Sequence, residues 1–304
     1  MNKIVLVGCG NVGMSYAYSL INSMLHIDEF IIVDINKQKA EGEALDLKHA
    51  SSALNKKMII KAGDYSDCNN ASIVCICAGR NQEVGETRND LILKNYAVFQ
   101  SIIKEINKTK FNGIYLIATN PLDIMTHITQ ELSGFPKERV IGSGTTLDTA
   151  RLRDLISDEL EINPRNIHAY VIGEHGDSEF VPWSNAIIGL NKATSYLNKK
   201  TREKIQNDVR NSAYDIINKK GNTCYGIGVC LRNITKAILD NNNTILTVSC
   251  YDKSSGVYIG LPAVIGENGV KKVFYLELNE EEKAQFDNSV HCIKDTLKSL
   301  KKSM

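Results

Sequence analysis

Six short apolar runs, separated by helix-like segments, constrain the fold of this chain more than any other feature of its sequence. Each run is apolar at consecutive positions instead of alternating with polar residues, which is typical of strands buried on both faces of a parallel sheet. Such strands alternate with helices as βαβ units, so the first half of the chain is predicted to be an α/β fold with a doubly wound parallel sheet. The six runs are "KIVLVG", "FIIVD", "KMIIKAGD", "SIVCICAG", "GIYLIATN" and "RVIGSG".

The character of the sequence changes near Gly144, where the sixth run ends. A long helix is predicted in "LDTARLRDLISDELEI" and a polar helical segment in "KTREKIQNDVRNSAYDIINKKG". Two later runs, "NNTILTVSCY" and "VYIGLPAVIG", are predicted to be antiparallel strands. We therefore predict two domains, residues 1–143 with the parallel sheet and residues 144–304 with a mixed α+β fold. No repeat or Pro-rich linker separates them, so they are expected to pack closely.

The stretch "VGCGNVG" follows the first apolar run and places three glycines in the spacing G-x-G-x-x-G. Alone this spacing is weak evidence, but here a strand precedes it, a helix follows it, and the next strand ends in Asp34, 21 residues beyond Gly13. Gly8 would form the tight turn, Gly10 would let the backbone approach a pyrophosphate, and Gly13 would let the helix pack on the strand. The context therefore predicts a dinucleotide-binding domain of the Rossmann type.

The acidic residue after the second strand indicates which dinucleotide is bound. Asp34 would hold the ribose hydroxyls of the adenosine and repel a 2′-phosphate, which favours NAD over NADP. A doubly wound fold that binds another nucleotide, or none, is the alternative. The predicted cofactor-binding residues also include Asn11, Val12, Ala78, Gly79, Thr119 and Asn120.

Composition and charge exclude several classes of function. The 36 basic and 35 acidic side chains leave a net charge of +1, so no global field attracts nucleic acid or an anionic membrane. The eight cysteines show no framework spacing, and Cys75 and Cys77 would be small buried side chains that point the same way. The N-terminal run "IVLV" is too short for a signal peptide, and no apolar window reaches the length of a membrane span. We expect a cytoplasmic protein with reduced thiols.

The stretch "NIHAYVIGEHGDSEF" places His168 and His175 seven residues apart. Its β-branched and aromatic residues favour a strand, in which the two histidines would lie about 23 Å apart. In a helix they would still lie roughly 10 Å apart. Two imidazoles that share a metal ion must each come within about 2.1 Å of it, so a shared metal site is excluded and no metal is predicted.

The helix predicted to begin near Thr146 carries three charged residues of interest. Asp148 and Arg151 are three residues apart and share a face, whereas Arg153 is turned about 200° away from Arg151. Surface ion pairing would explain any one of them. It does not explain their coincidence with a nucleotide fold and a histidine flanked by glycines.

Four segments in this order carry a resemblance: "AGRNQEVGETR" (78–88), "ATNPLD" (118–123), "GTTLDTARLR" (144–153) and "GEHGDSE" (173–179). With the glycine loop, they make the chain similar to the 2-hydroxy-acid dehydrogenases of the lactate and malate family, most closely to the bacterial L-lactate dehydrogenases. The resemblance runs from Lys3 almost to the C-terminus. It implies that residues 1–143 bind NAD and that residues 144–304 hold the substrate and the catalytic groups.

The resemblance implies a role for each matching residue. His175 would donate the proton to the ketone during reduction and accept it during oxidation, and Asp148 would accept a hydrogen bond from its other ring nitrogen. Arg151 would bind the substrate carboxylate with two parallel hydrogen bonds. Arg88 would polarise the carbonyl when its loop closes. Two further residues would contact or line the substrate pocket, Asn120 and Thr223.

One position bears on the substrate. Gln82 matches the specificity position of the family, where malate enzymes usually carry arginine, and a neutral side chain there favours pyruvate over a dicarboxylate, whose second charge would be buried unpaired. Arg80 departs from the family pattern; it would supply a cation to a dicarboxylate, reach the pyrophosphate or face solvent. A malate or branched-chain 2-hydroxy-acid dehydrogenase is the main alternative. A catalytically silent NAD-binding protein is the other, although none of the catalytic residues is missing.

The first histidine matches a regulatory pattern. In relatives activated by fructose 1,6-bisphosphate, an arginine two residues past the carboxylate-binding arginine and a histidine seven before the catalytic one form an anion site across a two-fold axis. Arg153 and His168 occupy these positions. Facing copies would repel each other, and a bisphosphate would neutralise them and favour the assembled enzyme. The resemblance thus implies a homotetramer of glycolysis and fermentation, allosterically activated by the bisphosphate.

Overall fold

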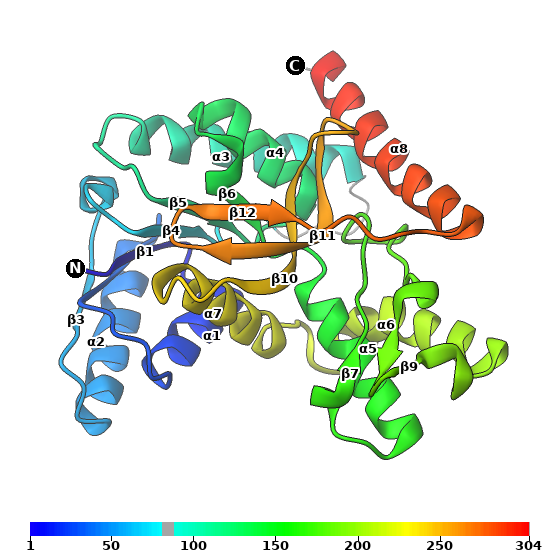
Figure 1. The fold of residues 1–304 in the computed structure, drawn as a ribbon. Helices are drawn as coiled ribbons and strands as arrows, with labels where there is room; N and C mark the ends of the chain where they lie inside the picture. The colour runs from blue at the N-terminus through cyan, green and yellow to red at the C-terminus, as the bar shows by residue number, and fades with distance from the viewer. Residues whose placement is uncertain (81–87, 304) are drawn as a thin grey trace.

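The structure is a computed structural model that describes residues 1–80 and 88–303, with twelve strands and eight helices among these residues (Figure 1). The strands are β1 (Lys3–Val7), β2 (Glu29–Val33), β3 (Ile59–Ala62), β4 (Ile73–Ile76), β5 (Ile114–Ile117), β6 (Val140–Gly142), β7 (Ile167–His168), β8 (Ile187–Ile188), β9 (Asn191–Lys192), β10 (Thr244–Asp252), β11 (Val257–Gly266) and β12 (Gly269–Val273). The helices are α1 (Asn11–Ile21), α2 (Lys37–Ala53), α3 (Arg88–Ile106), α4 (Leu122–Ser133), α5 (Thr146–Leu160), α6 (Lys199–Lys220), α7 (Tyr225–Leu239) and α8 (Glu280–Ser303).

The six apolar runs form six neighbouring parallel strands, which confirms the predicted doubly wound sheet. Their order in the sheet is β3-β2-β1-β4-β5-β6. The chain adds β2 and β3 on one side of β1 and then adds β4, β5 and β6 on the other side, so the strand order reverses between β1 and β4. Ligands of such sheets bind at this switch point, beyond the carboxyl ends of the strands. The segments that follow β1, β4 and β5 all lie at this edge.

The second half of the chain extends the same sheet. Strands β10 and β11 are antiparallel, as predicted, with Thr244 opposite Ile265 and Asp252 opposite Val257. β10 also pairs with β6, where Ser249 lies opposite Gly142, and β12 closes the far edge. The nine strands therefore form one continuous sheet across the predicted boundary at residue 143, and the division into two domains stays a prediction.

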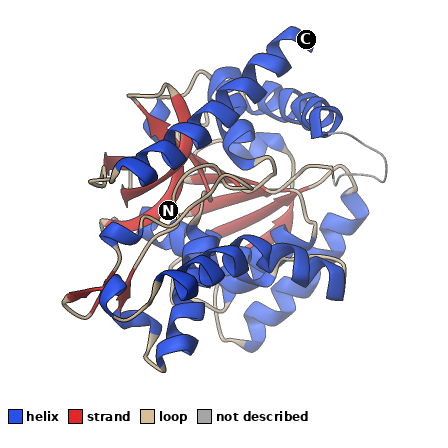
Figure 2. Ribbon diagram, turned by 90° about the vertical axis from the view of Figure 1, so that its right-hand side faces the viewer, coloured by secondary structure: helices blue, strands red, loops and turns tan. Residues whose placement is uncertain are grey.

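Helices cover both faces of this sheet (Figure 2), which explains why its central strands β1, β4, β5 and β6 are buried along their whole length. α1, α2 and α7 form one layer and α3, α4 and α8 the other (Figure 1). Strands β7, β8 and β9 form a small separate sheet beside α5 and α6, over a second apolar cluster that includes Leu152 and Val209. None of the described helices is long and apolar enough to cross a membrane.

Two local predictions need correction. The segment "IHAYVIG" is a strand only at Ile167–His168; beyond it, single bridges pair Ile172 with Phe180 and Gly173 with Gly260. Gly173 has φ +100°, outside the β region, so the stretch cannot continue through this residue as one regular strand. Cys75 is fully buried but Cys77 is partly exposed, because it lies just past the end of β4. Their sulfur atoms are 3.8 Å apart, on the same side as predicted.

Candidate active site

The glycine loop joins β1 to α1 at the switch point of the sheet. Gly8 has φ +100°, and a Cβ there would lie 2.5 Å from the backbone nitrogen of Ala78 on the neighbouring connection. A Cβ at Gly13 would lie 2.1 Å from the carbonyl oxygen of Gly8, so only glycine lets α1 approach the loop this closely. A Cβ at Gly10 would meet no described atom within 4 Å, so open space lies in front of this residue.

The first turn of α1 suits an anionic group. Gly10 is the N-cap and provides no side-chain hydrogen bond, so the amides of Asn11, Val12 and Gly13 lack a capping side chain. Amides at a helix N-terminus, together with the helix dipole, bind phosphates. The loop and the open space beside Gly10 therefore fit the pyrophosphate of a dinucleotide.

Asp34 directly follows β2 and lies beside the glycine loop. Its Oδ2 accepts a hydrogen bond from the amide of Cys9 at 2.8 Å, and its Oδ1 accepts one from the amide of Asn36 at 2.9 Å. Burial acts to raise the pKa of Asp34, but these hydrogen bonds outweigh it and hold the pKa below the ordinary value. An ionised carboxylate is therefore fixed where it can accept hydrogen bonds from ribose hydroxyls.

The ends of β4 and β5 are tied together on the other side of the switch point. The hydroxyl of Thr119 donates to the carbonyl of Ala78 at 2.7 Å, and a Cβ at Gly79 would lie 2.5 Å from Cγ2 of Thr119. Asn95 of α3, which is fully buried, donates from Nδ2 to the carbonyl of Asn120 at 2.9 Å and accepts from the amide of Arg80 at 2.8 Å. The side chain of Asn120 itself is exposed.

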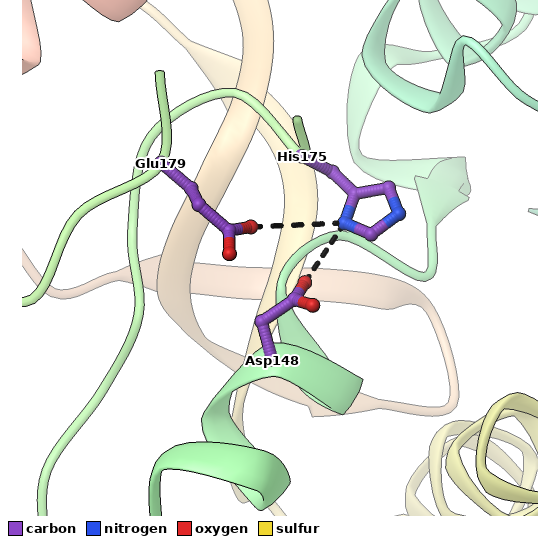
Figure 3. Close-up of side chains that lie close together, drawn as sticks. All are labelled: Asp148, His175 and Glu179. Atoms are coloured by element: carbon purple, nitrogen blue, oxygen red, sulfur yellow. Dashed lines mark hydrogen bonds and ion pairs between the residues drawn. The ribbon is translucent and has the colours of Figure 1, made fainter. Parts of the chain in front are cut away.

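His175 and Asp148 meet at the start of the second half of the chain (Figure 3). Nδ1 of His175 lies 2.8 Å from Oδ2 of Asp148, and Nη1 of Arg151 donates to Oδ1 of the same carboxylate at 2.9 Å. Asp148 is nearly fully buried, whereas His175 retains 27% of its side-chain exposure. Nε2 points away from Asp148, so this nitrogen is available to a bound molecule (Figure 3).

The electrostatics of this group favour a charged imidazole. Burial acts to lower the pKa of His175, but the charge and hydrogen bond of Asp148, with smaller contributions from Glu179 and Asp123, raise it to about 9. Burial likewise acts to raise the pKa of Asp148, but His175 and Arg151 hold it below the ordinary value. At neutral pH the site therefore holds a protonated imidazole and an ionised Asp148.

The main chain of the histidine is fixed by a residue of the "ATNPLD" segment for which the sequence predicted no role. Asp123 of α4 accepts a hydrogen bond from the amide of His175 at 2.7 Å and one from the hydroxyl of Ser249 at 2.5 Å. It is 2% exposed, and burial raises the pKa of its carboxyl to about 6. A carboxylate within the apolar stretch "PLDIM" requires an internal partner, which was the available signal.

The remaining predicted residues are placed as follows. Gln82 lies outside the described residues, and the side chain of Arg88, the first residue of α3, is also not described. Thr223 is partly buried in the short connection from α6 to α7, and α7 packs on α5. Arg153 donates from Nε to the carbonyl of Ala169 at 3.2 Å, directly beside the exposed His168.

Comparison with known proteins covers nearly the whole chain. The family model described as lactate/malate dehydrogenase, NAD binding domain, matches residues 2–142, and that described as the alpha/beta C-terminal domain of lactate/malate dehydrogenase matches residues 145–304. An "L-lactate dehydrogenase 2" of Bacillus cereus is 50% identical over 98% of this chain and 98% of its own. "L-lactate dehydrogenase" of a Geobacillus species is 48% identical over 98% of this chain and 96% of its own.

Solved structures agree with the fold. A lactate dehydrogenase from a Medee basin deep-sea metagenome library superposes with a TM-score of 0.95 at 45% identity, over 99% of both chains. The minor L-lactate dehydrogenase of Enterococcus mundtii, in its ligands-bound form, gives a TM-score of 0.94 at 40% identity over 98% of both chains.

Proposed function

The chain belongs to the lactate/malate dehydrogenase family, and from this premise we propose that it is an NAD-dependent L-lactate dehydrogenase that interconverts pyruvate and L-lactate. The observation that carries the proposal is the contact of His175 with Asp148, and of Asp148 with Arg151, in a chain whose glycine loop fits a dinucleotide. The proposal places the enzyme in the cytoplasm, in glycolytic fermentation.

In the proposed mechanism the protein moves one proton and holds the substrate. NAD, when bound, supplies the hydride chemistry. His175 donates a proton from Nε2 to the ketone oxygen in reduction and takes it back in oxidation. Asp148 accepts from Nδ1, which fixes the tautomer and stabilises the charged ring. The guanidinium of Arg151 has five N–H donors, and among the described residues one of them is used, in the hydrogen bond to Asp148. The other donors can bind the substrate carboxylate.

Other residues of the proposed site act on the carbonyl and on the pocket. Arg88 would polarise the ketone, and Asn120 would hydrogen-bond near it, with its backbone held by Asn95. Thr223 would line the pocket. The cofactor would lie along the glycine loop, with Asp34 on the ribose.

The first prediction concerns the proton donor. Replacing His175 with Ala removes the group that protonates the ketone, so turnover is expected to fall by about 10²-fold or more, the usual contribution of a general acid or base. NADH binding, which depends on the glycine loop, should remain close to that of the parent in a fluorescence titration. Parent-like turnover would remove His175 from its assigned role.

The second prediction concerns the substrate. Gln82 is neutral, so the dicarboxylate oxaloacetate would bring an unpaired charge into the closed site, which costs several kcal/mol. Pyruvate should therefore give a much higher kcat/KM than oxaloacetate when NADH oxidation is followed. Comparable values for pyruvate and oxaloacetate would show that Arg80, which is exposed, supplies the second cation.

We also propose that fructose 1,6-bisphosphate activates the enzyme by assembling a tetramer. The support is that Nε of Arg153 donates to the carbonyl of Ala169, so the Arg153 side chain lies next to the segment that carries the exposed His168. The bisphosphate should lower the pyruvate KM and increase the tetramer fraction in sedimentation. Arg153→Gln should abolish both effects. Fructose 6-phosphate, with one phosphate, serves as the ligand control, and an unresponsive parent enzyme would refute activation.

A further inference from the structure

A second carboxylate faces the imidazole of His175 (Figure 3). Oε2 of Glu179 lies 4.0 Å from Nδ1, the same ring nitrogen that Asp148 approaches to 2.8 Å. Asp148 comes from α5, whereas Glu179 comes from the segment that follows the histidine itself. Two carboxylates from different parts of the fold therefore act on one ring nitrogen.

Glu179 is held in place and kept from water. Its amide donates to the carbonyl of Gly176 at 3.2 Å, and its carbonyl accepts from Nη2 of Arg210 at 2.9 Å. Its side chain is only 6% exposed. Among the residues that the structure describes, no hydrogen bond to its carboxylate oxygens is found. Burying a carboxylate without such bonds is costly unless a charge of opposite sign compensates it, and His175 is the cation facing it.

Once Glu179 is ionised, its charge and that of Asp148 are balanced only while the imidazole is protonated. Asp148 and Glu179 then oppose His175 and Arg151, one charge for another. When the imidazole is neutral, two carboxylates remain against one guanidinium. Burial and the charge of Asp148 raise the pKa of Glu179 well above its ordinary value, and His175 and Arg151 act to lower it. Further ionisable or charged groups around the pair are Asp123 of α4, Arg210 of α6, Cys230 of α7 and Glu174 beside the histidine.

We propose that Glu179 is a second carboxylate partner of the catalytic imidazole, a positioning residue whose negative charge keeps His175 protonated toward alkaline pH and so widens the pH range of ketone reduction. The inference rests on the proposed dehydrogenase function and names the residue that tunes its proton donor. As the pH rises, Glu179 loses its proton to solvent. The new charge beside Nδ1 then delays the loss of the proton that the ketone requires.

The test compares the pH dependence of variants that differ in one charge. Glu179→Gln keeps the size of the side chain and removes its charge. Glu179→Asp keeps the charge but shortens the side chain by one methylene, which moves the charge away from the imidazole of His175. Asp177→Asn is the matched control, because Asp177 lies in the same segment but is exposed, so water screens its charge. For each protein, kcat/KM is measured across pH for pyruvate reduction and for lactate oxidation, and NADH binding reports correct folding.

In Glu179→Gln, kcat/KM for pyruvate reduction should begin to fall at a pH about one unit lower than in the parent. The rise of kcat/KM for lactate oxidation should shift to lower pH by the same amount, since both limbs of the pH profiles report the same imidazole. Glu179→Asp should fall between this variant and the parent, and Asp177→Asn should match the parent. A purely structural role would lower the plateau without moving the limbs. Parent-like limbs in Glu179→Gln overturn the inference, whereas a parent that reduces no 2-oxo acid overturns the proposed function instead.

A second measurement does not depend on turnover. Diethylpyrocarbonate reacts with a neutral imidazole and not with a protonated one. The difference between the parent and a His175→Ala protein isolates the modification of His175 from that of other side chains, so the pH midpoint of this difference reports the charge of the ring. This midpoint should be lower in Glu179→Gln than in the parent by the same shift as the kinetic limbs. An unchanged midpoint contradicts the proposal. If the Gln variant fails to bind NADH, the same measurements are made on Glu179→Leu, which is also uncharged and of similar size.

Discussion

At the scale of single residues, the chemistry depends on how carboxylates are distributed around His175. Asp148 binds Nδ1, Asp123 binds the backbone amide, and Glu179 faces Nδ1 without a hydrogen bond to it. The three carboxylates differ in effect because they approach different atoms of His175, or the same atom at different distances. The first fixes the tautomer, the second fixes the main chain, and the third adds charge.

The raised pKa of His175 predicts the pH dependence of the parent enzyme. A ring with a pKa of about 9 is protonated throughout the neutral range, and reduction requires the protonated form. The kcat/KM for pyruvate should therefore stay flat through neutral pH and fall as the pH passes about 9, while that for lactate oxidation rises over the same interval. As a control against irreversible unfolding, enzyme exposed to alkaline pH should regain full activity when it is returned to neutral pH. A limb near the ordinary histidine value of 6.5 would contradict the described environment.

At the scale of elements, the glycines of the loop between β1 and α1 differ in their roles, one in folding and another in binding. Gly13 is required by packing, because a Cβ there would collide with the carbonyl of Gly8, whereas Gly10 has open space before it. Sequence spacing alone treats both glycines as parts of the same motif. The tertiary environment gives them different tasks.

Alanine at each position tests this difference. Gly13→Ala should destabilise the fold by about 1–3 kcal/mol or more, because a Cβ 2.1 Å from the Gly8 oxygen forces α1 away from the loop. Gly10→Ala should leave the free energy of unfolding nearly unchanged and weaken NADH binding, since the added methyl group occupies the space proposed for the pyrophosphate. Urea denaturation and NADH fluorescence titration measure the two effects. Equal loss of stability in both variants would contradict the assignment.

At the scale of the whole molecule, the predicted halves share the nine-stranded sheet and the larger of the two apolar clusters. β6 pairs with β10, and α1 packs on α7 so closely that a Cβ at Gly228 would lie 2.6 Å from the backbone of Ser15. Asp123 of the first half holds His175 of the second. The site therefore forms only when both parts of the chain are folded together.

Residues 1–143 expressed alone should not form a stable monomer. The fragment would expose the edge of β6 and the face of α1 that α7 covers, and unpaired edges and apolar faces promote aggregation. Size-exclusion chromatography and circular dichroism should show aggregated or partly folded material, with the full chain as the control. A monomeric fragment with cooperative unfolding and NADH binding would show that the boundary at residue 143 separates independent folding units.

The sequence by itself determined the elements whose cause is local. Consecutive apolar residues predicted the six parallel strands because a strand buried on both faces has no polar side, and the glycine spacing predicted the loop because the turn and the helix contact leave no room for a Cβ. The helical spacing of Asp148 and Arg151 predicted that they share a face, since they are three residues apart, and on that face the structure has them in contact.

Only the tertiary structure decided which distant groups meet and how far water is excluded from them. Nothing in the local pattern shows that Asp123 reaches the amide of His175, that Ser249 pairs with Gly142, or that Glu179 is buried beside the ring. These contacts depend on how the β10–β11 hairpin, α4 and α5 pack together. Charges interact strongly only once that packing has removed the solvent, so the electrostatic character of the site belongs to the folded molecule.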